Sequence, residues 1–367
     1  MSRRRKAQLL VMAGAGVMLA SVLGVGGAGA ATSRAPASAA AAGAVSHVIN
    51  QTPAQVKAYW TPQRMRAALR RSPAAPALTP HHAAAWARNV LPSASAPPTM
   101  PRLPGRAGAR PLDLPTGGPF AQPWPNPNDE PSYTVGILYF NMPDGVPAQC
   151  TAAVITAANN DTLWTAGHCV YNQESQYGIG WMTNVMFAPD TAPGNATPLG
   201  SWYARGLVTT NGWMNSADAD YDLAAVVLSP GGNANQPIQP VTGAEGYLFN
   251  SGTYVWNVYI FGHPTYLTAP QQAVDPLQLR WCQGSTLQDQ WWNTVMETPC
   301  DMASGSSGGP WLANAQPVGD GLMGQIVGNV STGQECDTGG SSWDCAGLNS
   351  PYLGDGAVNV YNAAAPS

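Results

Sequence analysis

Charge is scarce in this chain, and each of its two parts lacks one sign of charge. Only 10% of the 367 residues are charged. Residues 1–110 contain no Asp or Glu and carry 14 of the 16 Lys and Arg residues, whereas Arg205 and Arg280 are the only bases among residues 111–367, which hold all 20 acids. Residues 1–110, the basic part of an N-terminal leader, therefore have a net charge of +14. Residues 111–367, which include the acidic body, have a net charge of −18. An acidic body repels nucleic acid, which we exclude as a partner, and it attracts the basic leader.

Cysteine is absent before Cys150, and histidine is absent after His263. Six cysteines in an exported chain indicate disulfides. Many pairings are formally possible, and proximity favours Cys150 with Cys169, Cys282 with Cys300, and Cys336 with Cys345. A zinc site is the alternative, but the chain has no Cys-x2-Cys pair and no histidine to complete one late in the sequence. We predict neither a metal nor a cofactor.

The first 30 residues have the pattern of a secretory signal peptide. A basic head, Ser2-Arg3-Arg4-Arg5-Lys6, precedes an apolar run from Leu9 to about Gly27, and Ala28-Gly29-Ala30 forms a small-x-small end. This pattern predicts cleavage after Ala30 and a secreted, extracellular protein. An uncleaved membrane anchor and a transit peptide are the alternatives, and the twin arginines leave Sec and Tat export both open. After cleavage we expect no stable membrane association.

Residues 31–125 are predicted to be a basic, Ala/Pro-rich propeptide and linker. Two helices are expected inside it, because Thr52-Pro53 and Thr61-Pro62 each place a capping threonine before a proline at the first helical position. These helices have no apolar core of their own, so we expect them to lie on the acidic body. The maturation point falls between Arg71 and Pro131, and Arg110 is a candidate because it is the last base of the leader.

Residues 126–367 change to short β-type runs separated by Gly, Pro, Asn and Asp, without a long helical period. This texture predicts an all-β sandwich, a barrel or a pair of barrels. The expected strands are 134–141, 149–156, 182–187, 203–209, 223–228, 253–261, 277–282, 293–298, 321–330 and 357–361.

A small-residue loop, Cys300 to Trp311, places Ser306 and Ser307 between glycines. Such a loop suits a tight turn that presents a nucleophile, and it also fits an ordinary turn. The spacing Gly305-x-Ser307-x-Gly309 matches the nucleophile elbow of α/β-hydrolases as well. Those enzymes place their histidine after the serine, and no histidine follows Ser307. A serine enzyme here must take its histidine from upstream.

His168 and Asp222 are the upstream candidates. His168 precedes Cys169, and a disulfide there would fix the ring position that a general base needs. His263, the competitor, is interpreted as a loop residue before Pro264. Asp222 borders a run of six apolar residues, where a buried carboxylate can orient an imidazole. Asp218 and Asp220 fit an acidic surface turn.

Thr165-Ala166-Gly167-His168-Cys169, Asp222-Leu223-Ala224 and Gly305 to Pro310, in this order, resemble the three motifs of trypsin-like (chymotrypsin-clan) serine proteases. The resemblance covers about residues 130–365. The Cys300-Asp301-Met302 lead-in, Ser306 and the Tyr59-Trp60-Thr61-Pro62 segment look most like secreted actinobacterial members near the glutamyl-endopeptidase branch. The resemblance to trypsin-like proteases implies two six-stranded antiparallel Greek-key β-barrels, about residues 130–240 and 241–365, with the active site between them.

The same resemblance implies the roles of the site residues. Ser307 would attack the scissile carbonyl, His168 would accept and return the proton, and Asp222 would hold the imidazole tautomer. The backbone amides of Gly305 and Ser307 would form the oxyanion hole, at about 3 kcal/mol per donor.

Two departures from trypsins matter. Where they carry an aspartate that pairs with the new N-terminal amine, this chain has Ser306, so we expect activation by removal of a propeptide that covers the site. Cys300 lies seven residues before Ser307 instead of four, so the specificity pocket does not align. Asp301 is either the receptor of a basic substrate side chain or a turn cap, and we favour the cap. With two arginines in the body and no late histidine, selectivity for Glu is disfavoured.

The sequence thus predicts a secreted, monomeric serine endopeptidase that acts on proteins or peptides, with its own propeptide as an intramolecular partner. A catalytically silent binding protein of the same fold and an esterase with the same triad are the alternatives.

Overall fold

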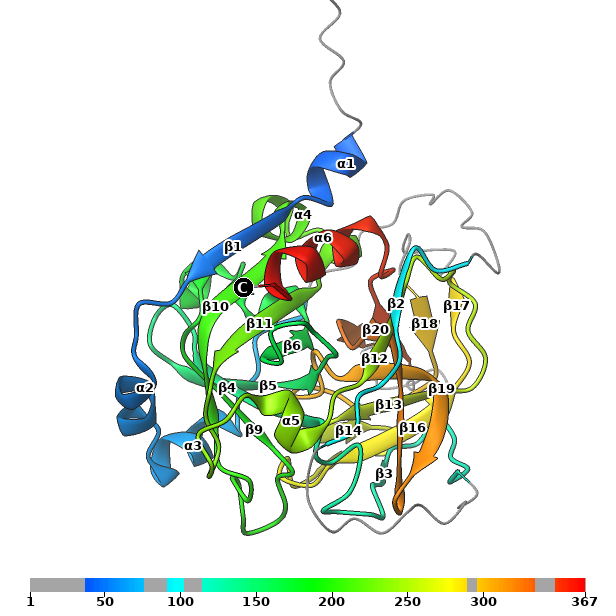
Figure 1. The fold of residues 1–367 in the computed structure, drawn as a ribbon, viewed down its shortest axis with the longest axis horizontal. Helices are drawn as coiled ribbons and strands as arrows, with labels where there is room; N and C mark the ends of the chain where they lie inside the picture. The colour runs from blue at the N-terminus through cyan, green and yellow to red at the C-terminus, as the bar shows by residue number, and fades with distance from the viewer. Residues whose placement is uncertain (1–36, 76–90, 102–113, 289–295, 334–346, 367) are drawn as a thin grey trace, which may run out of the picture. The chain divides into compact units, whose positions relative to one another are not determined.

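The computed structural model describes residues 37–75, 91–101, 114–288, 296–333 and 347–366, and these residues build two β units (Figure 1). The first unit is a closed ring in which every neighbouring pair is antiparallel and β10 pairs back with β9. Its strands are β4 (Val135–Asn141), β5 (Pro147–Val154), β6 (Thr162–Thr165), β9 (Thr183–Pro189), β10 (Trp202–Thr210) and β11 (Ala224–Ser229). The predicted six-stranded antiparallel barrel is confirmed for this unit.

The second unit has a core sheet in the order β12-β20-β19-β13-β16, with a parallel pairing between β12 and β20. These strands are β12 (Gly246–Phe249), β13 (Val258–Gly262), β16 (Arg280–Gly284), β19 (Pro310–Val318) and β20 (Gly321–Asn329). A smaller sheet contains β17 (Leu287–Gln288), β18 (Met296–Thr298), β22 (Leu348–Ser350) and β21 (Thr332–Gly333). Among the described residues, the pairings do not close this unit into a ring.

Shorter elements decorate both units. They are the hairpins β7 (Tyr171–Asn172) with β8 (Gly180–Trp181) and β14 (Tyr266–Thr268) with β15 (Gln271–Ala273), the helices α4 (Asn211–Ser216) and α5 (Ile238–Thr242), and the 3-10 turns η1 (Gly167–Cys169), η2 (Ser175–Tyr177) and η3 (Ala219–Tyr221). None of the helices in the described ranges is long and apolar enough to cross a membrane.

One predicted strand, 357–361, is wrong. It lies inside the helix α6 (Asp355–Ala364), whose buried residues Gly356, Ala357, Val360 and Ala364 follow helical spacing and whose contacts include β10 and β11. A five-residue run is too short to separate a period of 2 from a period of 3.6, so the packing surface decided the conformation. Sequence patterns also missed β6, β12 and β19.

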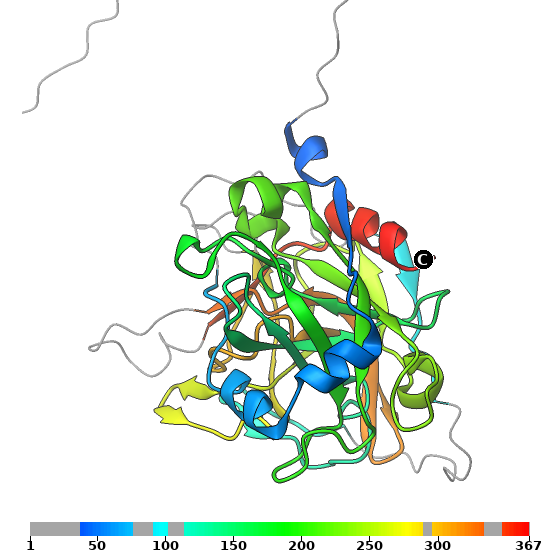
Figure 2. The same cartoon turned by 90° about the vertical axis from the view of Figure 1, so that its left-hand side faces the viewer.

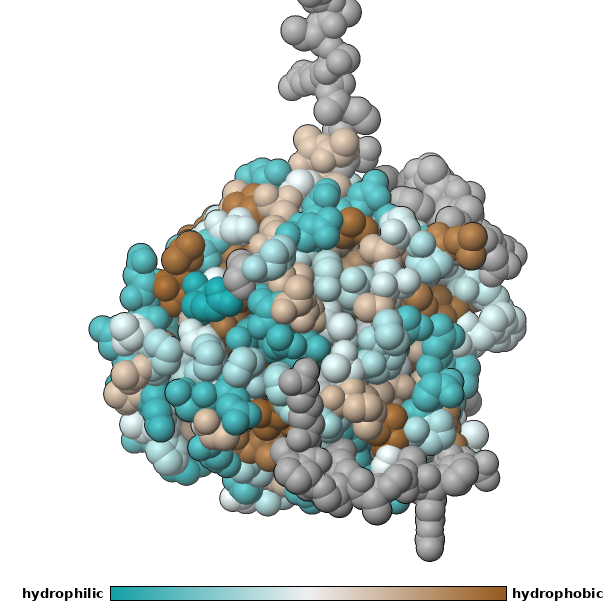
Figure 3. Space-filling view, in the orientation of Figure 1, coloured by the Kyte–Doolittle hydropathy of each residue, from teal (hydrophilic) through white to brown (hydrophobic). Residues whose placement is uncertain are grey.

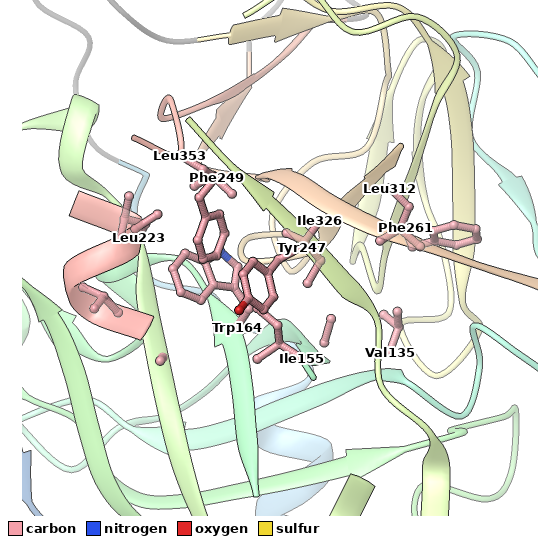
Figure 4. Packing of buried hydrophobic residues seen from close by; sticks show 14 of the residues in the cluster. Val135, Ile155, Trp164, Leu223, Tyr247, Phe249, Phe261, Leu312, Ile326 and Leu353 are labelled. Carbon is pink, nitrogen blue, oxygen red and sulfur yellow. The ribbon is translucent and has the colours of Figure 1, made fainter. Parts of the chain in front are cut away.

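A core of aromatic and aliphatic side chains fills the space between the two units. Trp164 of β6 lies 5.1 Å from Phe249 of β12, centroid to centroid, and Tyr247 and Leu353 lie close to Phe249 (Figure 4). This shared core fixes one unit against the other, which positions loops from both of them around a single cleft.

The leader wraps around both units. Its elements are α1 (Ala37–Ala41), β1 (Ala44–Val48), α2 (Pro53–Tyr59), α3 (Pro62–Ala68), β2 (Ala94–Ala96) and, at its end, β3 (Gln122–Pro123). β1 pairs with residues 206–210 of β10, beyond the point where β9 leaves that edge. β2 pairs with β12, and β3 pairs with β16. The leader therefore covers sheet edges that would otherwise be free to pair with other chains.

The two predicted leader helices are confirmed. Thr52 caps α2 in a capping box with Gln55, and Thr61 caps α3. α2 contacts β9 and β10, and α3 contacts β4 and β5, as Figure 2 shows for the two blue helices in front of the barrel. Their buried residues, Val56, Trp60 and Ala68, pack on apolar barrel side chains instead of on an acidic surface.

Candidate active site

His168 lies in η1, directly after β6. The disulfide between Cys150 of β5 and Cys169, with an S–S distance of 2.03 Å, ties this turn to the neighbouring strand. Gly167 has to be glycine, because a Cβ atom there would lie 2.8 Å from the ring of Trp213 and 3.0 Å from Asp222 Oδ1. The local sequence therefore holds the imidazole of His168 close to the carboxylate of Asp222.

Asp222 is fully buried and binds His168 twice. Its Oδ1 accepts the backbone N–H of His168 at 2.7 Å, and its Oδ2 lies 2.8 Å from Nδ1. Ser331 Oγ donates to the same Oδ2 at 2.6 Å. Because Nδ1 faces a carboxylate, the neutral ring carries its proton there, which leaves Nε2 as the acceptor. Nε2 is buried and has no hydrogen-bond partner in the part of the chain that the structure describes.

Ser307 lies beside the same disulfide. Its carbonyl oxygen accepts the N–H of Thr151 at 2.8 Å and lies 3.8 Å from Cys169 Sγ, and a ring nitrogen of His168 lies within 4.8 Å of that sulfur. Gly308 has φ +81°, and a Cβ atom there would lie 2.0 Å from Thr165 Oγ1. The loop that carries Ser307 can therefore pack against the strand before His168 only because residue 308 is glycine.

Gly305 also occupies a conformation that favours glycine. Its φ is +97°, and a Cβ atom would lie 2.4 Å from Gln149 Nε2 and 2.6 Å from the carbonyl oxygen of His263. The amide N–H groups of Gly305 and Ser307 have no acceptor among the described residues. Two free amides beside a serine side chain form the kind of donor pair that stabilises an oxyanion.

A cleft of about 520 Å³ opens at Ser307. The loop residues 302–304, 306 and 307, the segment 330–333 and the side chains of Glu174, Tyr266 and Thr268 line it. Leader residues 72–75 line the same cleft. Leader residues and Ser307 thus share one cleft.

The leader is held at the cleft by backbone hydrogen bonds and apolar packing. Gln149 N donates to Arg71 O at 2.9 Å, and Ala74 N donates to Glu174 Oε1 at 2.6 Å. Behind them, Trp60 packs on Tyr139 with ring centroids 5.6 Å apart and donates its Nε1 to Asn184 O at 2.7 Å. The five Lys and Arg residues in this part of the leader form no ion pair within the described ranges. They are Lys57, Arg64, Arg66, Arg70 and Arg71.

Residues 127–343 match the family described as Trypsin. The chain belongs to the trypsin family. Two solved structures resemble this trypsin-family chain: the protease Anisep from Arthrobacter nicotinovorans, 27% identical with a TM-score of 0.54, covering 64% of this chain and 96% of that one, and the thermostable serine protease AL20 from an extremophilic microorganism, 28% identical with a TM-score of 0.53, covering 64% and 98%. Family and neighbours are those of serine-type endopeptidases.

A curated relative, an extracellular metalloprotease of Bacillus subtilis (strain 168), is 36% identical over 84 residues. The match spans 22% of this trypsin-family chain and about a quarter, 24%, of the relative. The described residues contain one cluster with metal-ligand geometry, Cys150, His168 and Cys169. Both sulfurs are bonded to each other, so neither can act as a thiolate ligand.

The other sequence-predicted residues of this trypsin-family chain lie away from the cleft or outside the described ranges. Cys282 and Cys300 form a disulfide with an S–S distance of 2.08 Å, whereas Cys336 and Cys345 lie outside the described residues. His263 is buried after β13, where its Nδ1 donates to Pro276 O at 2.8 Å, and burial lowers its pKa to about 4. Its Nδ1 is thus engaged by a backbone carbonyl, and His263 does not line the cleft at Ser307.

Asp301 does not line the cleft. It is buried, and its Oδ1 accepts the N–H of Ala121 at 2.6 Å; burial raises its pKa, while that hydrogen bond and Arg280 lower it. The carboxylate therefore anchors the segment that enters the body, which is neither of the two roles that the sequence suggested.

Two residues that contact the site were not found from the sequence. Ser331 follows β20, and Thr151 lies in the middle of β5, where nothing in the local pattern distinguishes either from an ordinary strand residue. Their contacts join residues more than 100 positions apart in the sequence, such as Ser331 with Asp222 and Thr151 with Gly305.

Proposed function

We propose that this trypsin-family chain is a secreted serine endopeptidase that cleaves peptide bonds through an acyl-enzyme. Ser307 is the nucleophile, His168 the general base and Asp222 the residue that holds the imidazole. The observation that carries the proposal is the paired contact of His168 with Asp222, through Nδ1 at 2.8 Å and the backbone N–H at 2.7 Å, beside the Ser307 loop. This contact leaves Nε2 of His168 as the proton acceptor.

The chemistry runs in two steps. In the first, His168 Nε2 accepts the proton of Ser307 Oγ while Oγ bonds to the substrate carbonyl carbon, and the negative charge on the carbonyl oxygen is met by the N–H groups of Gly305 and Ser307. His168 then gives the proton to the leaving amine as the C–N bond breaks. In the second step water replaces the amine, and hydrolysis of the ester restores Ser307. Asp222 stabilises the imidazolium in both steps.

The leader acts as an intramolecular inhibitor in this proposal. Residues 1–30 are the signal peptide, and the rest of the leader up to about residue 125 is the propeptide and linker. Support comes from the path of the chain, because residues 72–75 line the cleft at Ser307. Leader strands at the other end pair with the body: β2 with β12, and β3 with β16. We expect these strands to remain after activation, so the activating cut falls before Ala94. Arg110, the candidate that the sequence offered, lies outside the described residues.

The test compares the full-length chain with the processed protein. A labelled fluorophosphonate is expected to modify Ser307 rapidly in the processed form, slowly in the full-length form, and not at all in S307A. Turnover of a peptide library distinguishes an endopeptidase from an esterase, which would hydrolyse only esters. A processed protein that folds but is never labelled is a silent binding protein, and the enzyme proposal is then wrong. N-terminal sequencing of the active form finds a start before Ala94 if β2 is retained.

A further inference from the structure

In the loop that carries Ser307, the carbonyl groups of residues 303–307 each accept at least one hydrogen bond. Residues 305–309 are buried, so their carbonyl groups need hydrogen-bond partners within the protein. The pairs are Ala303 O with Ser306 N and Oγ (3.1 and 2.6 Å), Ser304 O with Thr265 N and Oγ1 (2.8 and 3.0 Å), Gly305 O with Thr151 Oγ1 (2.8 Å), Ser306 O with Gly309 N (2.8 Å), and Ser307 O with Thr151 N (2.8 Å).

These bonds set the direction of the two free amides. In a trans peptide the C=O and the following N–H point in opposite directions, so a bond to one fixes the other. The bond on Ser304 O therefore directs the N–H of Gly305, and the bond on Ser306 O directs the N–H of Ser307. Both N–H groups have no acceptor among the described residues, which leaves them available to a substrate oxygen.

Thr151 binds the carbonyl groups of Gly305 and Ser307, the two residues whose N–H groups are free. Its Oγ1 donates to Gly305 O, and its N–H donates to Ser307 O, both at 2.8 Å. The same Oγ1 accepts the N–H of His263 at 2.9 Å, so that its own proton is left for Gly305. Thr151 is fully buried in β5 of the first barrel, while His263 follows β13 of the second unit. One side chain thus ties the loop to both units.

Ser306 does not anchor the loop to the rest of the protein. It is buried behind the nucleophile, but it is uncharged and donates its Oγ to Ala303 O inside the same loop. An internal bond of this kind tightens the turn and does not attach it to the rest of the protein. Thr151 in the first barrel and Thr265 in the second unit supply the attachment instead, and they do so with the leader still at the cleft.

We propose that Thr151 is a positioning residue for the oxyanion hole. It holds Gly305 and Ser307 by their carbonyl groups, while Thr265 and Gly309 N hold the preceding peptides that carry their N–H groups, so both residues are fixed on both sides before the leader is removed. The inference rests on the proposed function. It implies that leader removal opens access to a hole that is already formed.

The experiment compares T151V, which has the same shape without the hydroxyl, with T151S, which keeps it, in the processed protein. For T151V we expect kcat to fall about ten- to hundred-fold, less than the loss of an oxyanion donor itself, with KM within about two-fold of wild type. Affinity for a peptide boronic acid, whose tetrahedral adduct places an oxygen in the hole, should fall by a similar factor. T151S should stay within about three-fold of wild type in kcat.

Rates are divided by the concentration of Ser307 that a fluorophosphonate titrates, so a loss of folded protein does not imitate a loss of kcat. If T151V does not fold, T151A carries the same expectation, since the smaller side chain fits without strain. A T151V or T151A enzyme with wild-type kcat contradicts the inference while the protease proposal stands. A wild-type enzyme that fails to react with the fluorophosphonate contradicts the protease proposal instead.

Discussion

Gln149 donates its backbone N–H to the carbonyl of Arg71 at 2.9 Å, two positions before Thr151 on the same strand, β5. The strand that anchors the nucleophile loop therefore also receives the leader. In the proposed function, inhibition by the leader and catalysis at Ser307 therefore depend on the same strand, so we expect changes that loosen the leader to change the access of reagents to Ser307.

Trp60 is the largest of the buried leader side chains that pack on the barrel in the cluster with Val56 and Ala68. It is 7% exposed and packs on Tyr139. In the full-length chain, W60A should increase the rate of fluorophosphonate labelling by about ten-fold or more, since truncating a buried Trp costs about 3–5 kcal/mol. V48A is the matched control, because Val48 lies on the leader strand β1 and is 71% exposed. An equal increase for both variants would show that Trp60 has no special role.

Salt should have little effect on inhibition by the leader. The charge difference between leader and body suggests electrostatic attraction. The described contacts between them are, however, apolar contacts and hydrogen bonds of uncharged leader groups, such as Gln51 with Asn184 and Tyr59 with Asn141. The Lys and Arg residues from Lys57 to Arg71 form no ion pair within the described ranges. We expect the labelling rate of the full-length chain to change by less than about two-fold between low and high salt, where exposed charges are screened. A large increase at high salt would show that the charge difference holds the leader.

Ser331 is expected to support the Asp222 carboxylate. Its Oγ donates to Oδ2 at 2.6 Å, and hydrogen bonds to charged groups contribute about 1.5–3 kcal/mol. S331A should therefore lower kcat by about ten-fold or more with little change in KM, measured on a peptide substrate. S216A provides the same chemical change on the exposed end of α4, and it should leave kcat unchanged. Equal kcat values in S331A and wild type would contradict this role.

Glu245 should make stability depend on pH. It is fully buried, Thr134 Oγ1 and Gly324 N lie 2.5 and 2.8 Å from its carboxyl oxygens, and burial raises its pKa from 4.5 to about 8. Between these two values the folded state keeps a proton that the unfolded state has released, so the free energy of unfolding falls as pH rises.

E245Q removes this proton linkage. In an S307A background, which prevents self-digestion, the stability of E245Q relative to the parent should rise from pH 4.5 to 8, by up to about 4 kcal/mol. His263, whose lowered pKa makes stability rise with pH up to about 6.5, is present in both proteins and cancels in the difference. Urea unfolding at several pH values measures the effect. A difference that is constant with pH would mean that Glu245 is already ionised in the folded state.

Asp301 should affect stability and not specificity. Its carboxylate accepts the N–H of Ala121 and does not line the cleft. D301N should cost about 1–3 kcal/mol of stability, because a buried charge-assisted bond is weakened. The preference for the residue before the cleaved bond should be the same in D301N and wild type on a peptide library. A loss of preference for Arg or Lys in D301N would show that the carboxylate receives the substrate.

Local signals in the sequence were sufficient for the helices of the leader, most strands of the first barrel and the motifs around His168, Asp222 and Ser307. A capping threonine before a proline predicts a helix start, and a histidine between glycine and cysteine predicts a fixed imidazole, from a few residues alone. Backbone preference and covalent chemistry act at this short range. The order of the histidine and serine along the chain also excluded the α/β-hydrolase plan.

Only the tertiary structure decided what these residues contact. Asp301 lies within the nucleophile loop's own motif, yet the backbone of Ala121, 180 positions away, determines its role. Thr151 and Ser331 reach the site because β5 and β20 are brought together by a core that both units share. The face in Figure 3 mixes hydrophilic and hydrophobic residues. Long-range packing and hydrogen bonding, which no short segment encodes, set the path of the leader across the cleft and the anchoring of the loop at Ser307.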